Sequence, residues 1–191
     1  GFPEVVLNKR EETLKNYFFD ILQKDIIVRY DIRDKGVLEN IAVYLATNSS
    51  KIFSIESIKN SYNISYVAAN NYIKYLKESL LFFELPIFSY SLKKQSKSFK
   101  KIYSVDTGLA NTVSFRFSED RGRILENIVF LQLRRKYQEL YYYRTVNGLE
   151  VDFVVKEKDK IRELVQVSWD LYDTKTRERE IKSLVVAMKE L

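Results

Sequence analysis

The chain has 191 residues, enough for one large domain or two small ones, and 46% of them are hydrophobic, so a buried core is feasible. It contains no Cys and no His, which excludes disulfides, thiolate or imidazole catalysis, zinc fingers and haem ligation. Any catalysis must use carboxylates, Lys, Tyr, Ser or a hard metal ion such as Mg²⁺, whose preferred ligands are oxygens.

The net charge of +6 comes mainly from one segment. Residues 93–101 (KKQSKSFKK) contain five Lys and no acid, and the rest of the chain is almost neutral. Such a patch favours an anionic partner, most commonly nucleic acid; the alternative is a solvated loop. No apolar run approaches the roughly 18 residues of a membrane span and no secretory signal is visible, so we expect a cytoplasmic protein without a membrane partner.

The first 105 residues are predicted to form a connecting helical segment and a winged helix-turn-helix. Apolar residues at three- and four-residue spacing predict helices over Glu11–Arg29 and Val37–Ala46. Ser54 and Ser65 are the expected N-caps of two further helices, and the second, over Tyr66–Ser79, has the position of a recognition helix. Its buried stripe is expected to hold Val67, Ala68, Tyr72, Ile73, Leu76 and Leu80.

Strands are predicted over Leu81–Phe88 and Lys101–Val105, with a hairpin loop at Ser89–Phe99. The Lys-rich segment would then lie at the tip of the wing. The alternative is that the winged helix only docks proteins. We expect DNA contacts from the recognition helix and the wing, namely Asn70, Asn71, Lys74, Lys77, Lys93, Lys94, Lys97, Lys100 and Lys101.

The second half is predicted to be a mixed α/β module. Asp106 begins an Asx-type turn. A helix follows from about Glu119 to Lys136, and its inward face is expected to hold Ile124, Leu125, Ile128, Val129, Leu131 and Leu133. Asn147-Gly148 is a strong hairpin signal. A last helix over Thr174–Leu191 is expected to bury Ile181, Leu184, Val185 and Met188. The strands between the two helices are predicted over Glu139–Arg144, Glu150–Lys156 and Ile161–Ser168.

One group of polar residues could carry chemistry. Glu150 and Asp152 are two apart on a strand and project to the same face, so they form either a solvated edge or half of a metal site. Gln166 and Ser168 share a face of the next strand by the same alternation, and Glu126 interrupts an apolar helix.

This arrangement resembles the PD-(D/E)XK nuclease-like superfamily. The resemblance implies that Glu126 is the helix acid, Asp152 the strand Asp and Gln166 the Glu or Gln position, around one or two Mg²⁺ ions. Ser168 occupies the position of the family's Lys, which helps to activate water, so the sequence departs from the pattern there. Lys182 or Glu180 of the last helix could substitute.

The whole chain also resembles the C-terminal region of archaeal AAA-type P-loop ATPases, through the strings GFPEVVL, DIIVRYDIRD, FELPIFSYSLKKQ, KIYSVDTGL, FSEDRGRILENIVFLQLRR and EVDFVV. The resemblance implies a connecting segment at 1–35, a winged helix at 36–105 and a nuclease-like domain of restriction-endonuclease type at 106–191. It also implies that the chain is a fragment, with its ATP site in an upstream domain, because no P-loop motif occurs here.

We therefore expect a module that binds DNA or docks a partner, such as the upstream ATPase domain, with a degenerate nuclease-like domain that is not an enzyme by itself. One alternative is a Mg²⁺-dependent DNA nuclease that uses Glu126, Glu150 and Asp152 as metal ligands. The other is a purely structural interaction module, which a separation of Glu126 and Asp152 beyond about 8 Å would favour.

Overall fold

The computed structural model describes residues 11–115 and 120–191, and these form a mixed α+β protein. The chain divides into two compact units. Unit 1 comprises Gly1–Glu84 and Ile102–Glu119, and unit 2 comprises Leu85–Lys101 and Asp120–Leu191. Two expectations lie outside the described residues: the first part of the connecting segment (1–10) and the start of a helix at Glu119.

The first helix of unit 1 changes its pitch. α2 (Glu11–Ile21) continues as the π-helix η1 (Leu22–Ile27), instead of the regular helix that the apolar spacing predicted. An α-helix would place Leu22 and Ile27 about 140° apart around its axis, whereas the wider π turn brings them toward one side. Leu22, Ile26 and Ile27 are all buried as a result.

Two helices of unit 1 begin at the side-chain caps that the sequence predicted. Ser54 Oγ accepts from Ser57 N at the start of α4 (Ile55–Tyr62), and Ser65 Oγ accepts from Ala68 N at the start of α5 (Tyr66–Glu78). Asp106, which the sequence predicted only to begin a turn, also caps a helix, α7 (Thr107–Val113), because its Oδ1 accepts from Leu109 N. Between α4 and α5, Asn63 has a left-handed backbone (φ 50°), which Asn tolerates better than most residues and which turns the chain.

The remaining helix of unit 1, α3 (Lys35–Thr47), contributes the buried side chains of Leu38, Ile41 and Leu45 to the core. Three strands, β1 (Lys51–Phe53), β2 (Phe82–Pro86) and β3 (Lys100–Ser104), form a sheet in the order β1-β3-β2.

The buried stripe of α5 differs from the prediction. Ala69, Ile73 and Leu76 are buried, whereas Val67 and Leu80 are 67% and 60% exposed. The buried positions follow a spacing of four and then three, so the stripe is narrower than expected. Leu80 lies beyond the end of the helix in a left-handed conformation (φ 60°), outside the helical spacing that predicted its burial.

The segment between β2 and β3 belongs to unit 2. Part of it, predicted as a loop, forms the short helix α6 (Leu92–Lys97). Ile87 bridges Tyr142 in parallel, Phe88 N donates to Tyr142 O at 2.6 Å, and Tyr142 Oη donates to Phe99 O at 2.8 Å. Tyr142 thus holds the segment on both sides of α6, and the units separate within β2 and β3 rather than after Val105.

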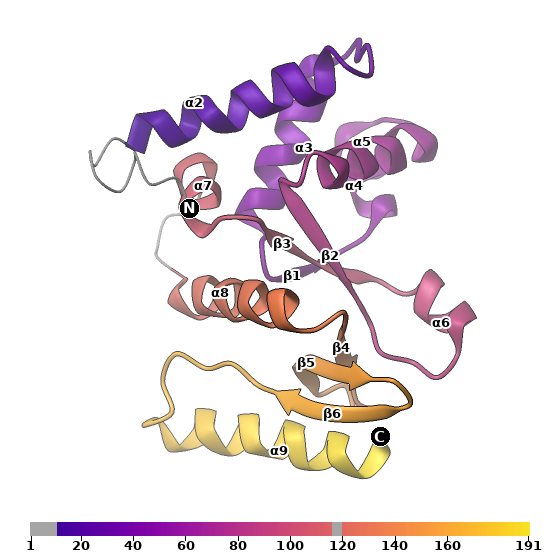
Figure 1. The fold of residues 1–191 in the computed structure, drawn as a ribbon, viewed down its shortest axis with the longest axis vertical. Helices are drawn as coiled ribbons and strands as arrows, with labels where there is room; N and C mark the ends of the chain where they lie inside the picture. The colour runs from indigo at the N-terminus through magenta and orange to yellow at the C-terminus, as the bar shows by residue number, and fades with distance from the viewer. Residues whose placement is uncertain (1–10, 116–119) are drawn as a thin grey trace. The chain divides into compact units, whose positions relative to one another are not determined.

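Unit 2 also contains an antiparallel sheet with a helix on either side. The sheet has the order β4-β5-β6, and Figure 1 shows it between two helices. Residues 151–155 of the central strand are all buried, which requires cover on both faces of the sheet. The elements are α8 (Arg121–Lys136), β4 (Glu139–Arg144), β5 (Glu150–Glu157), β6 (Lys160–Val165) and α9 (Thr174–Glu190).

Strand β6 ends three residues earlier than predicted. It stops at Val165, because the backbone N–H of Val167, two residues later, donates to the Asp152 carboxylate at 2.9 Å. Gln166 and Ser168 therefore follow the strand, and strand alternation does not decide where their side chains point.

The buried faces of α8 and α9 were also predicted differently. On α8 the buried residues are Asn127 and Phe130, and the Phe130 ring lies 6.3 Å from that of Phe153 on β5. On α9 they are Ser183 and Ala187, whose small size allows close approach to β5 and β6. The predicted stripe residues Ile181, Val185 and Met188 are 49%, 44% and 71% exposed.

Candidate functional site: a buried lysine among three carboxylates

The candidate site lies at the beginning of β5. Glu150 is the first residue of this strand and Asp152 follows two positions later, so both side chains project to the same side. Glu126 comes from α8, and Lys101 from β3. All four residues belong to unit 2.

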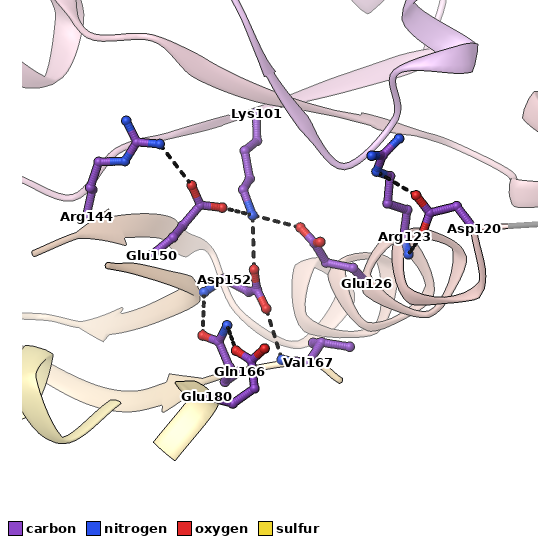
Figure 2. Close-up of polar contacts among 10 residues, drawn as sticks. All are labelled: Lys101, Asp120, Arg123, Glu126, Arg144, Glu150, Asp152, Gln166, Val167 and Glu180. Atoms are coloured by element: carbon purple, nitrogen blue, oxygen red, sulfur yellow. Dashed lines mark hydrogen bonds and ion pairs between the residues drawn. The ribbon is translucent and has the colours of Figure 1, made fainter. Parts of the chain in front are cut away.

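One ammonium group contacts all three carboxylates. Lys101 Nζ lies 2.8 Å from Glu126 Oε1, 2.7 Å from Glu150 Oε1 and 3.1 Å from Asp152 Oδ1. Figure 2 shows the Lys101 side chain pointing into the space among the carboxylates. The distances are those of charge-assisted hydrogen bonds, and an ammonium has three N–H donors to share among them. Since Lys101 is only 2% exposed, water is largely excluded from this ammonium.

The carboxylates raise the pKa of Lys101. Burial opposes the charged ammonium, but Glu126, Asp152 and Glu150 together outweigh burial and hold the pKa above its ordinary value of 10.5. A proton held this firmly makes Lys101 a poor general base near neutral pH. The geometry therefore assigns Lys101 the role of a fixed positive charge.

A second cation and burial also act on the carboxylates. Arg144 Nη2 lies 3.6 Å from the second oxygen of Glu150, so Glu150 contacts both Lys101 and Arg144. Burial and the Glu150 charge raise the pKa of Asp152, and Lys101 and the Val167 N–H oppose this rise only in part. The Asp152 carboxyl group therefore binds a proton more readily than an exposed Asp does.

A chain of hydrogen bonds continues from Asp152 to the last helix. The Asp152 N–H donates to Gln166 Oε1 at 3.2 Å, and Gln166 Nε2 donates to Glu180 Oε2 at 2.7 Å. The chain of contacts from Lys101 to α9 can be followed in Figure 2. Ser168, in the position of the family's Lys, does not join it, because Ser168 Oγ donates to the backbone oxygen of Asp170 instead.

The structure thus brings Glu126, Glu150, Asp152 and Gln166 together. Glu126 and Asp152 both contact Lys101 Nζ within 3.1 Å, so they are closer than the roughly 8 Å beyond which one metal ion could not bridge them. Glu180 reaches the site, as we considered from the sequence, through Gln166 rather than as a substitute for the missing Lys.

Lys101 is the residue that sequence reasoning misplaced. We assigned it to the exposed Lys-rich patch, whereas it is buried among carboxylates and cannot contact DNA in this arrangement. The sequence did contain a signal for the burial of Lys101, because this residue was also the first of a predicted strand, which continues with the buried Ile102 and Tyr103.

The other predicted DNA contacts lie on α5 and around α6. On α5, Asn70 and Lys74 are exposed, Asn71 is half-buried, and Lys77 pairs with Glu84 at 2.5 Å. On α6, Lys93, Lys94 and Lys97 are exposed, and none of the helix's residues is buried. Lys100 is half-buried and has an interaction partner.

Residues 1–120, well over half of the chain, match the family model described as "Domain of unknown function (DUF8612)". The chain belongs to this family. Residues 121–190 match a second model, "Domain of unknown function (DUF4143)". In this DUF8612 protein, the three carboxylates therefore lie in the second match, and the lysine that they surround lies in the first.

Two curated relatives of this DUF8612 protein are uncharacterized proteins. One, from Methanocaldococcus jannaschii, is 39% identical over 204 residues, which cover 100% of this chain and 44% of the relative. The other, from Haemophilus influenzae, is 27% identical over 179 residues, which cover 90% of this chain and 44% of the relative. The chain thus spans less than half the length of these relatives. No solved structure matches it.

The donor atoms at the site suit a hard metal ion, but their arrangement differs from a metal site. Carboxylate oxygens are preferred ligands of Mg²⁺. Within residues 11–115 and 120–191, however, no group of three acidic side chains is arranged to hold a metal, and Lys101 contacts Glu126, Glu150 and Asp152 simultaneously. Magnesium binding therefore stays a prediction.

None of the helices within residues 11–115 and 120–191 is both long and apolar enough to cross a membrane.

Proposed function

We propose that this chain is a nucleic-acid-binding module whose second unit is a nuclease-like domain that no longer cleaves. The observation that carries the proposal is the Lys101 ammonium in contact with Glu126, Glu150 and Asp152. A cleaving site of the PD-(D/E)XK kind uses such carboxylates to hold a metal ion, and here they hold a side chain of the same protein.

The DNA-binding part of the proposal is supported by the order of elements in unit 1. α3, β1, α4 and α5 precede β2 and β3, and both this order of elements and the sheet order β1-β3-β2 fit the winged helix expected from the sequence. In this interpretation α5 is the recognition helix and offers Asn70 and Lys74 to phosphates and base edges. The exposed lysines of α6 supply further phosphate contacts.

We further propose that the chain belongs to a longer P-loop ATPase of the AAA type. The support is the resemblance of its sequence strings and the length of the relatives, of which it matches 44%. In such a protein, ATP hydrolysis in the remaining part would be coupled to binding by this module. Stimulation of ATP hydrolysis by DNA in the full-length protein would test this coupling.

DNA binding is tested by fluorescence anisotropy with a labelled duplex at several salt concentrations. Replacing Lys93, Lys94 and Lys97 by Gln should lower the slope of log affinity against log salt by about 1 for each lost phosphate contact. The matched control replaces Lys175, Lys182 and Lys189, which are exposed on α9, by Gln. It should lower the slope less than the α6 variant does. No binding at low salt, or equal losses in both variants, would contradict the proposal.

A second candidate function, metal-dependent DNA cleavage, is favoured by the convergence of the three carboxylates. Lys101 would then stand in for the family's Lys as a fixed positive charge, because Ser168 occupies that Lys position in the sequence. Incubation with DNA and Mg²⁺ or Mn²⁺ separates the two functions. Cleavage by the wild type that is lost in Asp152→Asn would establish the nuclease. If the wild type cleaves neither single- nor double-stranded DNA, the result would support the binding module.

A further inference from the structure

Unit 2 also contains a broad groove. Its volume is about 700 Å³. It lies at the end of α8 and the β5–β6 hairpin, and it does not include the Lys101 site or α6. The lining residues are Lys136, Tyr137, Gln138, Glu139, Lys156, Glu157, Lys158, Lys160, Ile161 and Arg162.

The lining of the groove has a net positive charge. Five cationic side chains line it against two carboxylates, so the formal charge of the lining is +3. Lys156 is paired with Glu139 at 2.8 Å, and Arg162 is paired with Glu157 at 2.5 Å and with Glu163 at 3.3 Å. Among the described residues, Lys158 and Lys160 have no ion-pair partner and both are exposed. Their charge is available to a ligand.

Several cations converge on the groove from different elements. The ring of the buried Tyr137 lies 4.9 Å from Lys136 Nζ and 5.5 Å from Arg162 Cζ, so it brings a cation of α8 near one of β6. Lys160 and Arg162 are two residues apart on β6 and project to one side, separated by about 6.6 Å along the strand. The positive charge is therefore spread along the groove rather than focused on one point.

We propose that this groove binds the sugar-phosphate backbone of a nucleic acid. A row of flexible lysines fits a repeating anion better than a single buried phosphate, which would need fixed donors. The groove offers no aromatic face for stacking, since Tyr137 is only 6% exposed. The contact should therefore be independent of sequence. The inference rests on the nucleic-acid binding proposed above and assigns part of it to a surface outside α5 and α6.

The test uses the whole chain with Lys158→Asn and Lys160→Gln combined. Asn is chosen at 158 because the backbone there is left-handed (φ 55°), which Asn tolerates. At about 0.1 M salt, each lost phosphate contact should weaken DNA binding roughly 8-fold and lower the salt slope by about 0.9. The control, Lys175→Gln with Lys189→Gln, removes the same charge from α9 and should lose clearly less affinity. Equal losses in the two variants would overturn the proposal.

Amide chemical shifts locate the contact independently of affinity. Adding a short DNA duplex should shift amides of residues 156–162 in the wild type. Shifts confined to α5 and α6 would overturn this inference and leave the proposed function standing, whereas no binding at all would overturn both. Equal shifts with inorganic pyrophosphate at the same phosphate concentration would show a small-anion site and also overturn the assignment.

Discussion

Replacing Lys101 by Met should destabilise the protein strongly. The variant leaves Glu126, Glu150 and Asp152 around an apolar side chain, without the ammonium that all three contact. Removing one partner of a buried ion pair costs about 3 to 5 kcal/mol of unfolding free energy. Denaturant unfolding measures this loss, and Lys94→Met, an exposed change on α6, should stay within about 0.5 kcal/mol of the wild type.

A second substitution distinguishes electrostatics from packing at this residue. If repulsion among the carboxylates causes the loss, adding Asp152→Asn to Lys101→Met should recover part of the stability. Additive losses in the double variant would instead mean that Lys101 acts mainly through the packing of its side chain.

The contribution of Lys101 should also depend on pH. Its pKa is raised above 10.5, so the folded protein binds this proton more tightly than the unfolded chain does. The stabilisation is therefore complete below pH 10.5 and is lost as the pH rises through the folded pKa. The difference in unfolding free energy between wild type and Lys101→Met should shrink in that alkaline range; a constant difference would contradict this electrostatic account.

At the scale of elements, α9 is attached to the sheet at two polar points. Gln166 joins Asp152 of β5 to Glu180, and at the other end Glu190 accepts from Tyr143 Oη at 2.8 Å. Burial, together with the bond to Glu190, raises the pKa of Tyr143 to about 12. These contacts explain why α9 presents Ser183 and Ala187 to the sheet rather than its larger apolar residues.

Gln166→Leu should loosen this attachment. The Asp152 N–H and Glu180 would both lose their amide partner, and an unsatisfied buried polar group costs about 1 to 3 kcal/mol. Denaturant unfolding measures the cost, and hydrogen exchange should show faster opening of α9. Gln132→Leu, on an exposed position of α8, is the control and should change neither quantity appreciably.

The sequence predicted local elements better than it predicted their faces. The caps at Ser54 and Ser65 follow from short-range hydrogen bonding, which residues close in the sequence determine. The faces of α8 and α9 depend on contacts with β5 and β6, which are distant in sequence. Apolar periodicity could not reveal that small residues and polar anchors would decide the orientation of α9.

The candidate site could likewise be predicted only in part. Its acids could be identified from strand alternation and the family pattern, because Glu150 and Asp152 lie on one strand. The place of Lys101 among these acids could not be predicted, because the Tyr142 contacts that hold its segment in unit 2 are long-range. Composition alone grouped it with Lys93, Lys94, Lys97 and Lys100.

For the whole molecule, the winged-helix interpretation predicts a defined contribution of α5 to DNA binding. Lys74→Gln should weaken binding to all sequences alike and lower the salt slope by about 1, whereas Asn70→Ala should also change the preference among sequences. Anisotropy titrations with several duplexes measure both effects. If neither substitution alters binding, α5 is not the recognition helix.

For the whole molecule, we propose that Lys101, and not a metal ion, is the cation of the carboxylate site. Titration of Mn²⁺ followed by electron paramagnetic resonance tests this claim most directly. The wild type should bind no Mn²⁺ ion tightly, and Lys101→Ala should gain one site that Asp152→Asn removes again. Stoichiometric Mn²⁺ binding to the wild type that disappears in Asp152→Asn would contradict the account.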